Sequence, residues 1–159
     1  MECHQPKTSQ AASSEGIILI GNPNVGKSVI FGHLTGNYAT VSNYPGTTVD
    51  YTVGTCHIGN KHREVVDTPG TYSLIPKSED EKVARDVLLS RNPYCVVQVG
   101  DAKNPRRTLD LTLQLLETGL PMILVLNMID EAQERGIIPN AKKLSDILGI
   151  PVITTSAIT

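Results

Sequence analysis

The sequence predicts an α/β fold: a mostly parallel, six-stranded sheet with helices on both faces. Short apolar runs alternate along the chain with segments of helical periodicity, which is the pattern of parallel strands joined by helical connections. A glycine-rich segment, residues 21–28, stands between the first apolar run and the first helical segment. Folds that bind phosphate between a strand and a helix have this arrangement.

Six apolar runs are expected to form the strands. They are Ile17–Gly21, Asp50–Ile58, Glu64–Asp67, Cys95–Asp101, Met122–Asn127 and Val152–Thr155. The second run alternates between apolar and polar residues more than the others and ends near the turn-forming pair Gly59-Asn60. The second and third runs are therefore expected to pair as an antiparallel hairpin at the edge of the sheet.

Helices are expected between these runs. The first covers Val29–Leu34, and the second begins at Ser78 with a capping pattern and an acidic first turn. The third opens at Asn104-Pro105 and stops at Gly119, and the last covers Asn140–Leu148. A domain of this class usually has a further helix after its last strand. Because none is visible here, we expect the chain to be a fragment of a longer protein.

Composition and charge narrow the classes of function. The net charge is −2 and Lys and Arg form no dense cluster, so nucleic acid is not an expected partner. The three cysteines are scattered, which fits a reducing cytosol, and neither Cys3-His4 nor Cys56-His57 has a second pair at zinc-site spacing. We expect one domain over residues 16–159, after a flexible leader, tag remnant or tether over residues 1–15. No apolar run approaches the roughly 20 residues that span a bilayer, so the chain as given is expected to be soluble.

The segment Gly21–Ser28 completes the phosphate-binding pattern GxxxxGK[ST]. Gly21 and Gly26 allow the loop to wrap a polyphosphate with its N–H groups pointing inward, and the next helix directs its positive dipole end at the same phosphates. Lys27 is expected to neutralise the β- and γ-phosphates, and Ser28 to ligate Mg²⁺. The residues expected to surround the phosphates are Asn22, Pro23, Asn24, Val25, Gly26, Lys27, Ser28 and Val29. The alternative is a glycine-rich turn that binds nothing.

Two further segments supply candidate groups for a γ-phosphate switch. Asp67-Thr68-Pro69-Gly70 has the form DxxG, in which Asp67 can hold a Mg²⁺-bound water and the N–H of Gly70 can face the γ-phosphate. An Asp before a Pro-Gly turn is also a common strand end. A mobile loop over Asn43–Val49 can bring Thr48 to Mg²⁺ when γ-phosphate is present, with Thr47 as the alternative ligand. Lys27, Thr48 and Gly70 are the candidate catalytic residues.

The base is expected to lie against Asn127-Met128-Ile129-Asp130, which has the form NxxD. The Asp130 carboxylate can accept from both the N1–H and the exocyclic amine of guanine, a donor pair that adenine lacks. Asn127 is expected to contact N7 and brace the loop, unless the segment is only a turn that starts a helix. Ser156-Ala157 follows the last strand, where the Ala157 N–H can face guanine O6.

Taken together, these motifs resemble those of TRAFAC-class GTPases, and in detail the cytosolic G domain of the bacterial ferrous-iron transporter FeoB family. The resemblance covers nearly all of residues 16–159 and implies a Ras-like P-loop NTPase fold. The segments that carry it are residues 21–28, 43–49, 67–74, 81–86 and 127–130. Many GTPases have Lys where Met128 stands; the FeoB family is similar to this sequence in having Met, whose thioether can cover the base without a charge. Thr68 departs from the DLPG that is common in that family, which leaves a related cytosolic GTPase open.

The resemblance implies slow GTP hydrolysis. A water-orienting Gln often follows DxxG, but Thr71 stands here, so a switch is expected rather than a fast enzyme. In this family and in similar potassium-activated GTPases, an Asn at the position of Asn24 helps to hold K⁺ beside the phosphates. The alternative is an Asn that caps the loop by bonding its own backbone.

The resemblance also implies partners. GTP and GDP would be the ligands, and a helical region and a membrane transport region would follow in the full-length protein, at the cytoplasmic side of the bacterial inner membrane. The loops over Asn37–Val49 and Gly70–Ser78 would signal nucleotide state to that membrane part. Two alternatives stay open: a soluble ribosome-assembly GTPase of the same superfamily, and a nucleotide-gated binding module in which hydrolysis is incidental.

Overall fold

A computed structural model of the chain describes residues 16–157; the predicted leader over residues 1–15 lies outside the described residues. The strands are β1 (Ile17–Gly21), β2 (Ala39–Asn43), β3 (Asp50–Ile58), β4 (Lys61–Asp67), β5 (Cys95–Asp101), β6 (Met122–Asn127) and β7 (Val152–Thr154). The helices are α1 (Lys27–Thr35), α2 (Glu79–Arg91), α3 (Pro105–Glu117), α4 (Ile129–Glu134) and α5 (Ala141–Leu148).

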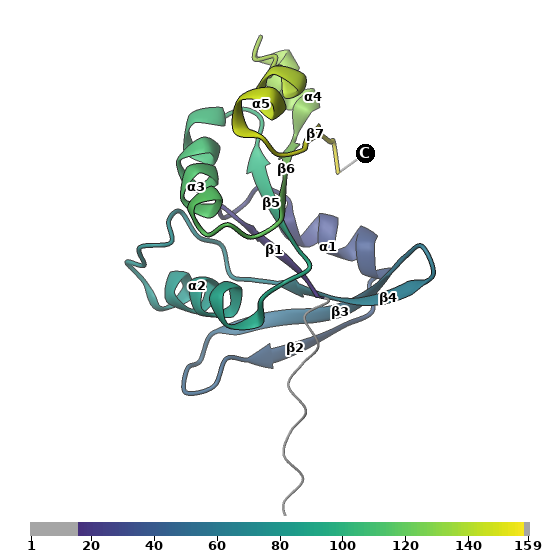
Figure 1. Cartoon of the computed structure of the whole chain (residues 1–159), viewed down its shortest axis with the longest axis vertical. Helices are drawn as coiled ribbons and strands as arrows, with labels where there is room; N and C mark the ends of the chain where they lie inside the picture. The colour runs from purple at the N-terminus through teal and green to yellow at the C-terminus, as the bar shows by residue number, and fades with distance from the viewer. Residues whose placement is uncertain (1–15, 158–159) are drawn as a thin grey trace, which may run out of the picture.

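The strands form one sheet in the order β2-β3-β4-β1-β5-β6-β7. β3 runs antiparallel to both β2 and β4, and the remaining neighbours are parallel, so the predicted α/β class and the predicted pairing of the hairpin are confirmed. The hairpin is not at the edge of the sheet as predicted, because β2 pairs with β3 on its outer side. Figure 1 shows the sheet twisting through the molecule with helices on both of its sides.

The sheet has seven strands where the sequence predicts six, because β2 lies inside the segment Asn37–Val49 that the sequence predicts to be a signalling loop. β2 is an edge strand, and four of its five residues are exposed. A strand exposed on both faces needs no apolar alternation, so its sequence carries no signal of the kind used to find the others.

Side chains of β1 show how the core forms on two faces of the sheet. Ile18 and Ile20 pack with apolar residues of α2 and α3, while Ile17 and Leu19 pack with Phe31 of α1 on the opposite face. This division follows from the alternation of side chains along a strand, and burial of both sets explains why β1 is apolar throughout.

Helix starts follow the predicted capping residues. The side chains of Ser78, Asn104 and Asn140 each accept a hydrogen bond from a backbone N–H three residues further on, at 3.2, 3.4 and 2.9 Å. These bonds satisfy amides that have no partner inside the helix. α1 begins at Lys27, two residues before the predicted start, and α4 is a short helix that the sequence analysis does not anticipate.

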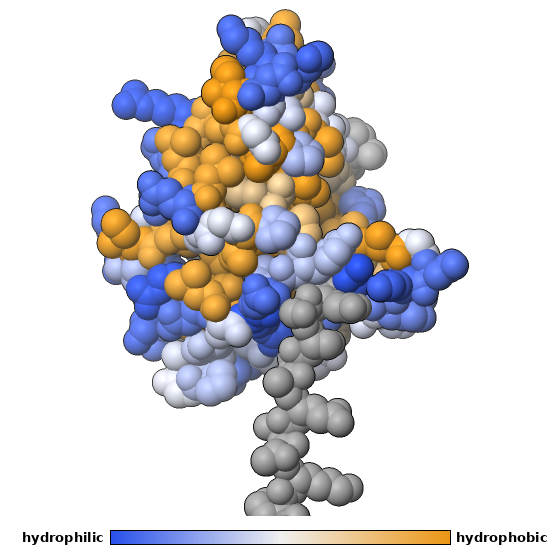
Figure 2. Space-filling view, in the orientation of Figure 1, coloured by the Kyte–Doolittle hydropathy of each residue, from blue (hydrophilic) through white to orange (hydrophobic). Residues whose placement is uncertain are grey.

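Apolar side chains also reach the surface. Figure 2 shows them gathered over the upper part of the molecule, where α3 and α5 lie. Each of these two helices has an exposed apolar residue: Leu113 of α3 is 55% exposed and Ile147 of α5 is 69% exposed. Within residues 16–157, no helix has both the length and the apolar character that crossing a membrane requires.

Candidate functional site

The phosphate-binding loop connects β1 to α1 and depends on two glycines. A side chain at Gly21 would collide with the carbonyl group of Val99 on β5, and one at Gly26 would collide with the amide of Asn127. Gly26 also has a φ of 81°, in the left-handed region that favours glycine. The two positions therefore need glycine for close approach and for backbone shape.

The loop encloses a cavity of about 250 Å³. Its lining residues are Asn22, Pro23, Asn24, Gly26, Lys27, Ser28 and Val29. These are seven of the eight residues predicted to surround the phosphates; the eighth, Val25, is buried beneath them. A larger groove of about 890 Å³ lies between the end of α1 and strands β2 to β4, but it contains none of the motif residues.

Lys27, Ser28 and Asp67 form a polar cluster at the base of this loop. The ammonium group of Lys27 pairs with Oδ1 of Asp67 and donates to the carbonyl oxygen of Thr68, and the Ser28 hydroxyl donates to Oδ2 of Asp67 at 2.8 Å. The side chains of Lys27 and Asp67 are only 9% and 8% exposed. Hydroxyl and carboxylate oxygens are the hard donors that Mg²⁺ prefers, so Ser28 and Asp67 together fit that metal.

The DxxG segment is fastened to the phosphate loop by its backbone and by Thr68. The Thr68 hydroxyl donates to the carbonyl oxygen of Leu19 on β1 at 2.9 Å, and the side chain is buried. A leucine there could not make this bond, so the departure from DLPG has a structural role in this chain. Gly70 lies against Pro23: a side chain on it would come within 2.9 Å of the Pro23 Cα.

Thr71, the residue after DxxG, is fully buried. Its hydroxyl donates to the carbonyl oxygen of Ser73 at 2.8 Å, and its N–H donates to that of Gly21 at 2.9 Å. Asn22 donates to the Thr71 carbonyl oxygen at 3.3 Å. Thr71 therefore shapes the loop and, in this conformation, does not present its hydroxyl to a water molecule.

Asn127 joins the segments predicted to hold the base. Its side-chain amide donates to the carbonyl oxygen of Val25 in the phosphate loop at 2.9 Å. Its Oδ1 accepts from the Thr155 hydroxyl at 2.9 Å and from the Ala157 N–H at 3.0 Å. The Asn127 side chain is completely buried, and its bond to Val25 is buried with it, whereas the bonds from Thr155 and Ala157 are partly buried. Asn127 therefore links the phosphate loop to the segment that follows β7.

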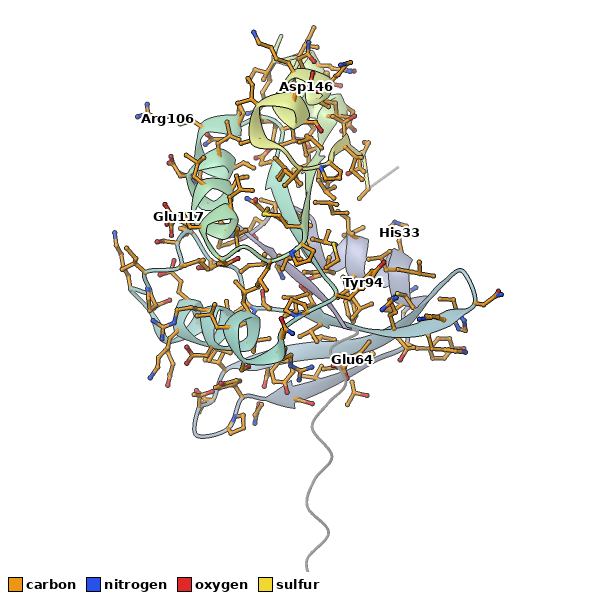
Figure 3. The ribbon with its side chains drawn as sticks, viewed as in Figure 1. His33, Glu64, Tyr94, Arg106, Glu117 and Asp146 are labelled. Carbon is orange, nitrogen blue, oxygen red and sulfur yellow. The ribbon has the colours of Figure 1, made fainter. Side chains whose placement is uncertain are left out.

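The contact of Ala157 differs from the expectation. We expected its N–H to face guanine O6, but in this structure that N–H donates to Asn127 instead. His33 of α1, labelled in Figure 3, approaches the same residue from the other side, with its Nε2 3.1 Å from the Ala157 carbonyl oxygen. A contact between Ala157 and a base requires the bond to Asn127 to be exchanged.

Asp130 lies at the start of α4 and is exposed. A hydrogen bond from Ser156, supported by backbone N–H groups and by the charge of Lys103, holds the pKa of the Asp130 carboxyl below its usual range. Asp130 is therefore ionised at neutral pH and able to accept two hydrogen bonds. Met128, two residues before Asp130, has a φ of 62° and a half-buried side chain. The structure thus brings together Asp130, at the start of α4, and Ser156, after β7.

Thr48 is exposed in a turn between β2 and β3. No hydrogen bond joins it to Lys27, Ser28 or Asp67 in the part of the chain that the structure describes. The alternative ligand, Thr47, is occupied: its hydroxyl donates to the carbonyl oxygen of Tyr44 at 3.0 Å and accepts from the Val49 N–H at 3.1 Å. For Thr48 to act as the metal ligand, this turn must move.

Glu81 and Gln114 belong to none of the nucleotide-binding motifs, yet their side chains hold the segment that follows DxxG in place. Glu81 accepts from the backbone N–H groups of Tyr72 at 3.1 Å and of Lys77 at 2.8 Å, and is buried. Gln114 of α3 accepts from the Ser73 hydroxyl at 2.9 Å and the Leu74 N–H at 2.8 Å. The sequence contains a signal for Glu81, the capping pattern from Ser78, but the pattern does not reveal that its carboxylate reaches back to the loop.

Cys56 and Cys95 have no metal-site neighbours in the described chain: no group of three or more His, Cys, Asp or Glu residues gathers within residues 16–157. Burial raises the pKa of both thiols. Cys3 and His4 lie outside the described residues.

Comparisons with known proteins agree on one family. The family model described as ferrous iron transport protein B matches residues 15–159. A Fe(2+) transport protein A/Fe(2+) transporter FeoB fusion protein of Porphyromonas gingivalis is 44% identical over 140 residues, 87% of this chain and 17% of that protein. The Fe(2+) transporter FeoB of Legionella pneumophila is 40% identical over 144 residues, 88% of this chain and 19% of that protein. The chain thus spans less than a fifth of the length of these two relatives.

Solved structures show the same similarity. The G domain of the T. maritima FeoB iron transporter superposes with a TM-score of 0.83 at 40% identity, covering 91% of this chain and 89% of that one. A mutant S. thermophilus NFeoB bound to GDP superposes with a TM-score of 0.85 at 47% identity, covering 92% of this chain and 56% of that one.

Proposed function

Because this chain belongs to the ferrous iron transport protein B family and has the fold of its G domain, we propose that it binds GTP and GDP and hydrolyses GTP slowly, as a nucleotide-dependent switch. The position of Asn127 is the observation that carries this proposal. Its side chain links Val25 of the phosphate loop to the two segments on which Asp130 and Ser156 lie. One nucleotide can therefore contact a phosphate site and a guanine site that share a single rigid brace. The GDP bound to the S. thermophilus neighbour supports this assignment.

Lys27 would recognise the phosphates by exchanging its present partners for them when a nucleotide binds. In the structure its ammonium group is held by Asp67 and Thr68. A polyphosphate in the loop offers it a larger negative charge, and the loop N–H groups and the start of α1 stabilise the same charge. Asp67 would stay hydrogen-bonded to Ser28, and the side-chain oxygen atoms of both residues would then face the phosphates.

Mg²⁺, when bound, would neutralise charge on the β- and γ-phosphates. Ser28 would hold it directly and Asp67 through a water molecule, while Thr48 would join them only after the turn at residues 44–49 has moved. Gly70 is placed against Pro23, so its N–H can respond to a γ-phosphate in the loop. Both loops next to the phosphates would then differ between the GTP and GDP states.

The rate of hydrolysis is expected to be slow. Hydrolysis of GTP depends on a positioned water molecule and on charge stabilisation. Thr71 stands where many GTPases have a water-orienting Gln, and its hydroxyl is bonded to Ser73. Lys27, Thr48 and Gly70 can stabilise charge, but we identify no side chain that positions the water. A further cation beside the phosphates would be a partial remedy, because it would add charge stabilisation of the kind that an arginine finger supplies.

We expect that cation to be K⁺, held with the help of Asn24. Asn24 lines the phosphate cavity, is exposed, and has a φ of 61°, a left-handed conformation that Asn tolerates. Replacing Na⁺ by K⁺ at constant ionic strength should raise phosphate release from GTP about tenfold or more, because a positive charge beside the transferred phosphoryl stabilises the transition state. Release from ATP should stay at background in both salts.

Asn24→Ala should remove the difference between K⁺ and Na⁺ while leaving GDP affinity within about threefold, since one neutral contact of the loop is lost. Asn60→Ala, in the exposed turn between β3 and β4, is the matched control and should retain the difference. Equal hydrolysis in the two salts by the unaltered chain would refute potassium activation.

The wider role follows from the family. We propose that the full-length protein continues into a helical region and a membrane transport region, with this domain at the cytoplasmic side of the bacterial inner membrane. The loops over residues 37–49 and 70–78 would carry the nucleotide state to that part. The soluble ribosome-assembly alternative is not favoured, because the family match and the relatives are ferrous iron transport proteins.

A further inference from the structure

Lys103 lies beside the guanine site without belonging to any of its motifs. It is the second residue after β5, whose end is in register with the end of β6 at Asn127. The Ala102 N–H donates to the Asn127 carbonyl oxygen at 2.9 Å, and the Lys103 N–H donates to Oδ1 of Asp101 at 2.8 Å. The backbone of Lys103 is therefore fixed next to the residue that braces the site.

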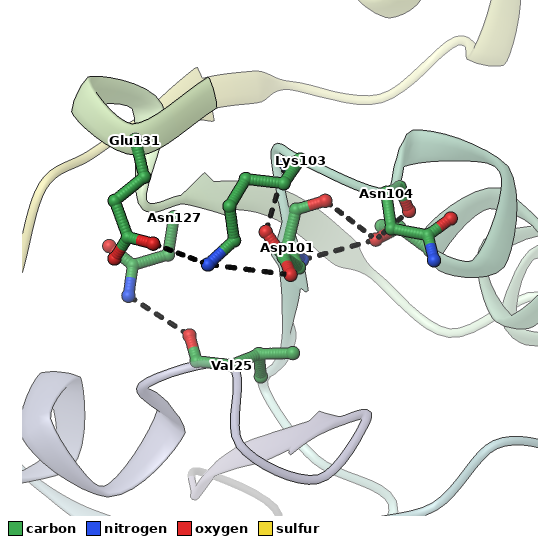
Figure 4. Close-up of polar contacts among 7 residues, drawn as sticks. Val25, Asp101, Lys103, Asn104, Asn127 and Glu131 are labelled. Atoms are coloured by element: carbon green, nitrogen blue, oxygen red, sulfur yellow. Dashed lines mark hydrogen bonds and ion pairs between the residues drawn. The ribbon is translucent and has the colours of Figure 1, made fainter. Parts of the chain in front are cut away.

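The side chain of Lys103 is surrounded by acidic groups. Its ammonium group is 2.6 Å from Oε2 of Glu131 and 4.0 Å from Oδ2 of Asp101, and only 16% of the side chain is exposed. Figure 4 shows it extended between these two carboxylates, beside Asn127. Its charge also acts on Asp130, as one of the causes of that carboxyl's lowered pKa. One cation thus lies among three carboxylates.

This position matters because the NxxD segment has no cation of its own. Met128 is neutral, and it is followed by two adjacent acids, Asp130 and Glu131. Without Lys103, the Glu131 carboxylate would lose its partner and lie near Asp130 as an unrestrained like charge. Repulsion from Glu131 would then act on the exposed Asp130 carboxylate and change its orientation, on which its paired bonds to guanine depend.

Resting on the proposed guanine site, we propose that Lys103 is a positioning residue for base recognition: it restrains Glu131 and offsets the acidic charge so that Asp130 alone faces the base. Lys103 needs no contact with the nucleotide for this role. It replaces, from a different strand end, the positive charge that Met128 does not supply. The effect should therefore concern the contact of Asp130 with the exocyclic amine of guanine more than the contact with the phosphates.

Calorimetric titrations of the 159-residue chain with GDP and IDP test this proposal. IDP has the N1–H of GDP but lacks the exocyclic amine. Lys103→Met should weaken GDP binding about fivefold and IDP binding by less than twofold, as expected for a partly exposed ion pair that orients a second group. Lys103→Arg should bind GDP within about twofold of the unaltered chain, because it can keep the pair with Glu131.

A double variant separates positioning from folding. Adding Glu131→Gln to Lys103→Met removes the unrestrained carboxylate and should restore most of the GDP affinity. Lys142→Met, which breaks an exposed ion pair with Asp146 on α5, is the control and should change neither nucleotide. GDP affinity within twofold in Lys103→Met, or equal losses for GDP and IDP, would overturn the proposal. If the unaltered chain binds no GDP, the proposed function itself fails, and this inference fails with it.

Discussion

Lys27→Met should reduce the affinity for GDP by about 100-fold or more. Lys27 would place a positive charge against phosphates that otherwise meet neutral N–H groups of the loop, and each charge-assisted hydrogen bond contributes about 1.5–3 kcal/mol. Its ammonium group is buried beside the loop, so no solvent ion replaces it equally well. Titration calorimetry with GDP in Mg²⁺ buffer measures the loss directly.

The same substitution removes the partner of Asp67, which is nearly buried. Leaving one member of a buried pair without its partner costs about 3–5 kcal/mol, so the variant must be compared by thermal unfolding as well. Lys27→Met combined with Asp67→Asn removes both charges and should recover part of the stability without recovering GDP binding. A folded Lys27→Met chain that binds GDP within threefold of the unaltered chain would contradict the role of Lys27.

Asp130→Asn should change which base is bound. In the proposed site the carboxylate would accept from two guanine donors, and its replacement by an amide would place a donor where the exocyclic amine also donates. GDP affinity should fall about 100-fold or more, while affinity for XDP, which has a carbonyl oxygen in place of that amine, should rise above that for GDP. Displacement of a bound fluorescent nucleotide by GDP and by XDP measures the two affinities and therefore the change in base preference.

Asp130 is exposed, and an asparagine there keeps a side-chain oxygen that can accept from Ser156, so the substitution should leave the fold intact. The thermal midpoint should stay within a few degrees of that of the unaltered chain. Asp110→Asn on the exposed face of α3 is the matched control and should keep the preference for GDP. An Asp130→Asn chain that still prefers GDP would place the base elsewhere.

Features with local causes could be predicted from the sequence. The phosphate loop follows from the spacing of Gly21, Gly26 and Lys27, because shape and charge are both set within eight residues. The helix starts at Ser78 and Asn140 follow from side chains that bond amides three residues away. Strands buried on both faces are continuous apolar runs, so β1 and β6 are correctly placed.

Features that depend on distant contacts could not be predicted in this way. β2 is exposed on both faces and is specified by pairing with β3. Gln114 holds a loop 40 residues earlier in the chain, and Lys103 pairs with Glu131 across the ends of two strands. The sequence predicts that the Ala157 N–H faces a base, whereas in the structure it donates to the Oδ1 of Asn127. A motif identifies the groups present at a site, whereas tertiary contacts decide which of them are engaged.

Titration calorimetry with GDP and with ADP in Mg²⁺ buffer is the decisive test of the proposed guanine nucleotide site. We predict that GDP binds at one site and that ADP does not bind measurably, because only guanine offers Asp130 its pair of donors. Equal binding of both nucleotides would show that the phosphate loop works but that the base is not read by Asp130. A folded chain that binds neither would contradict the assignment of a nucleotide site altogether.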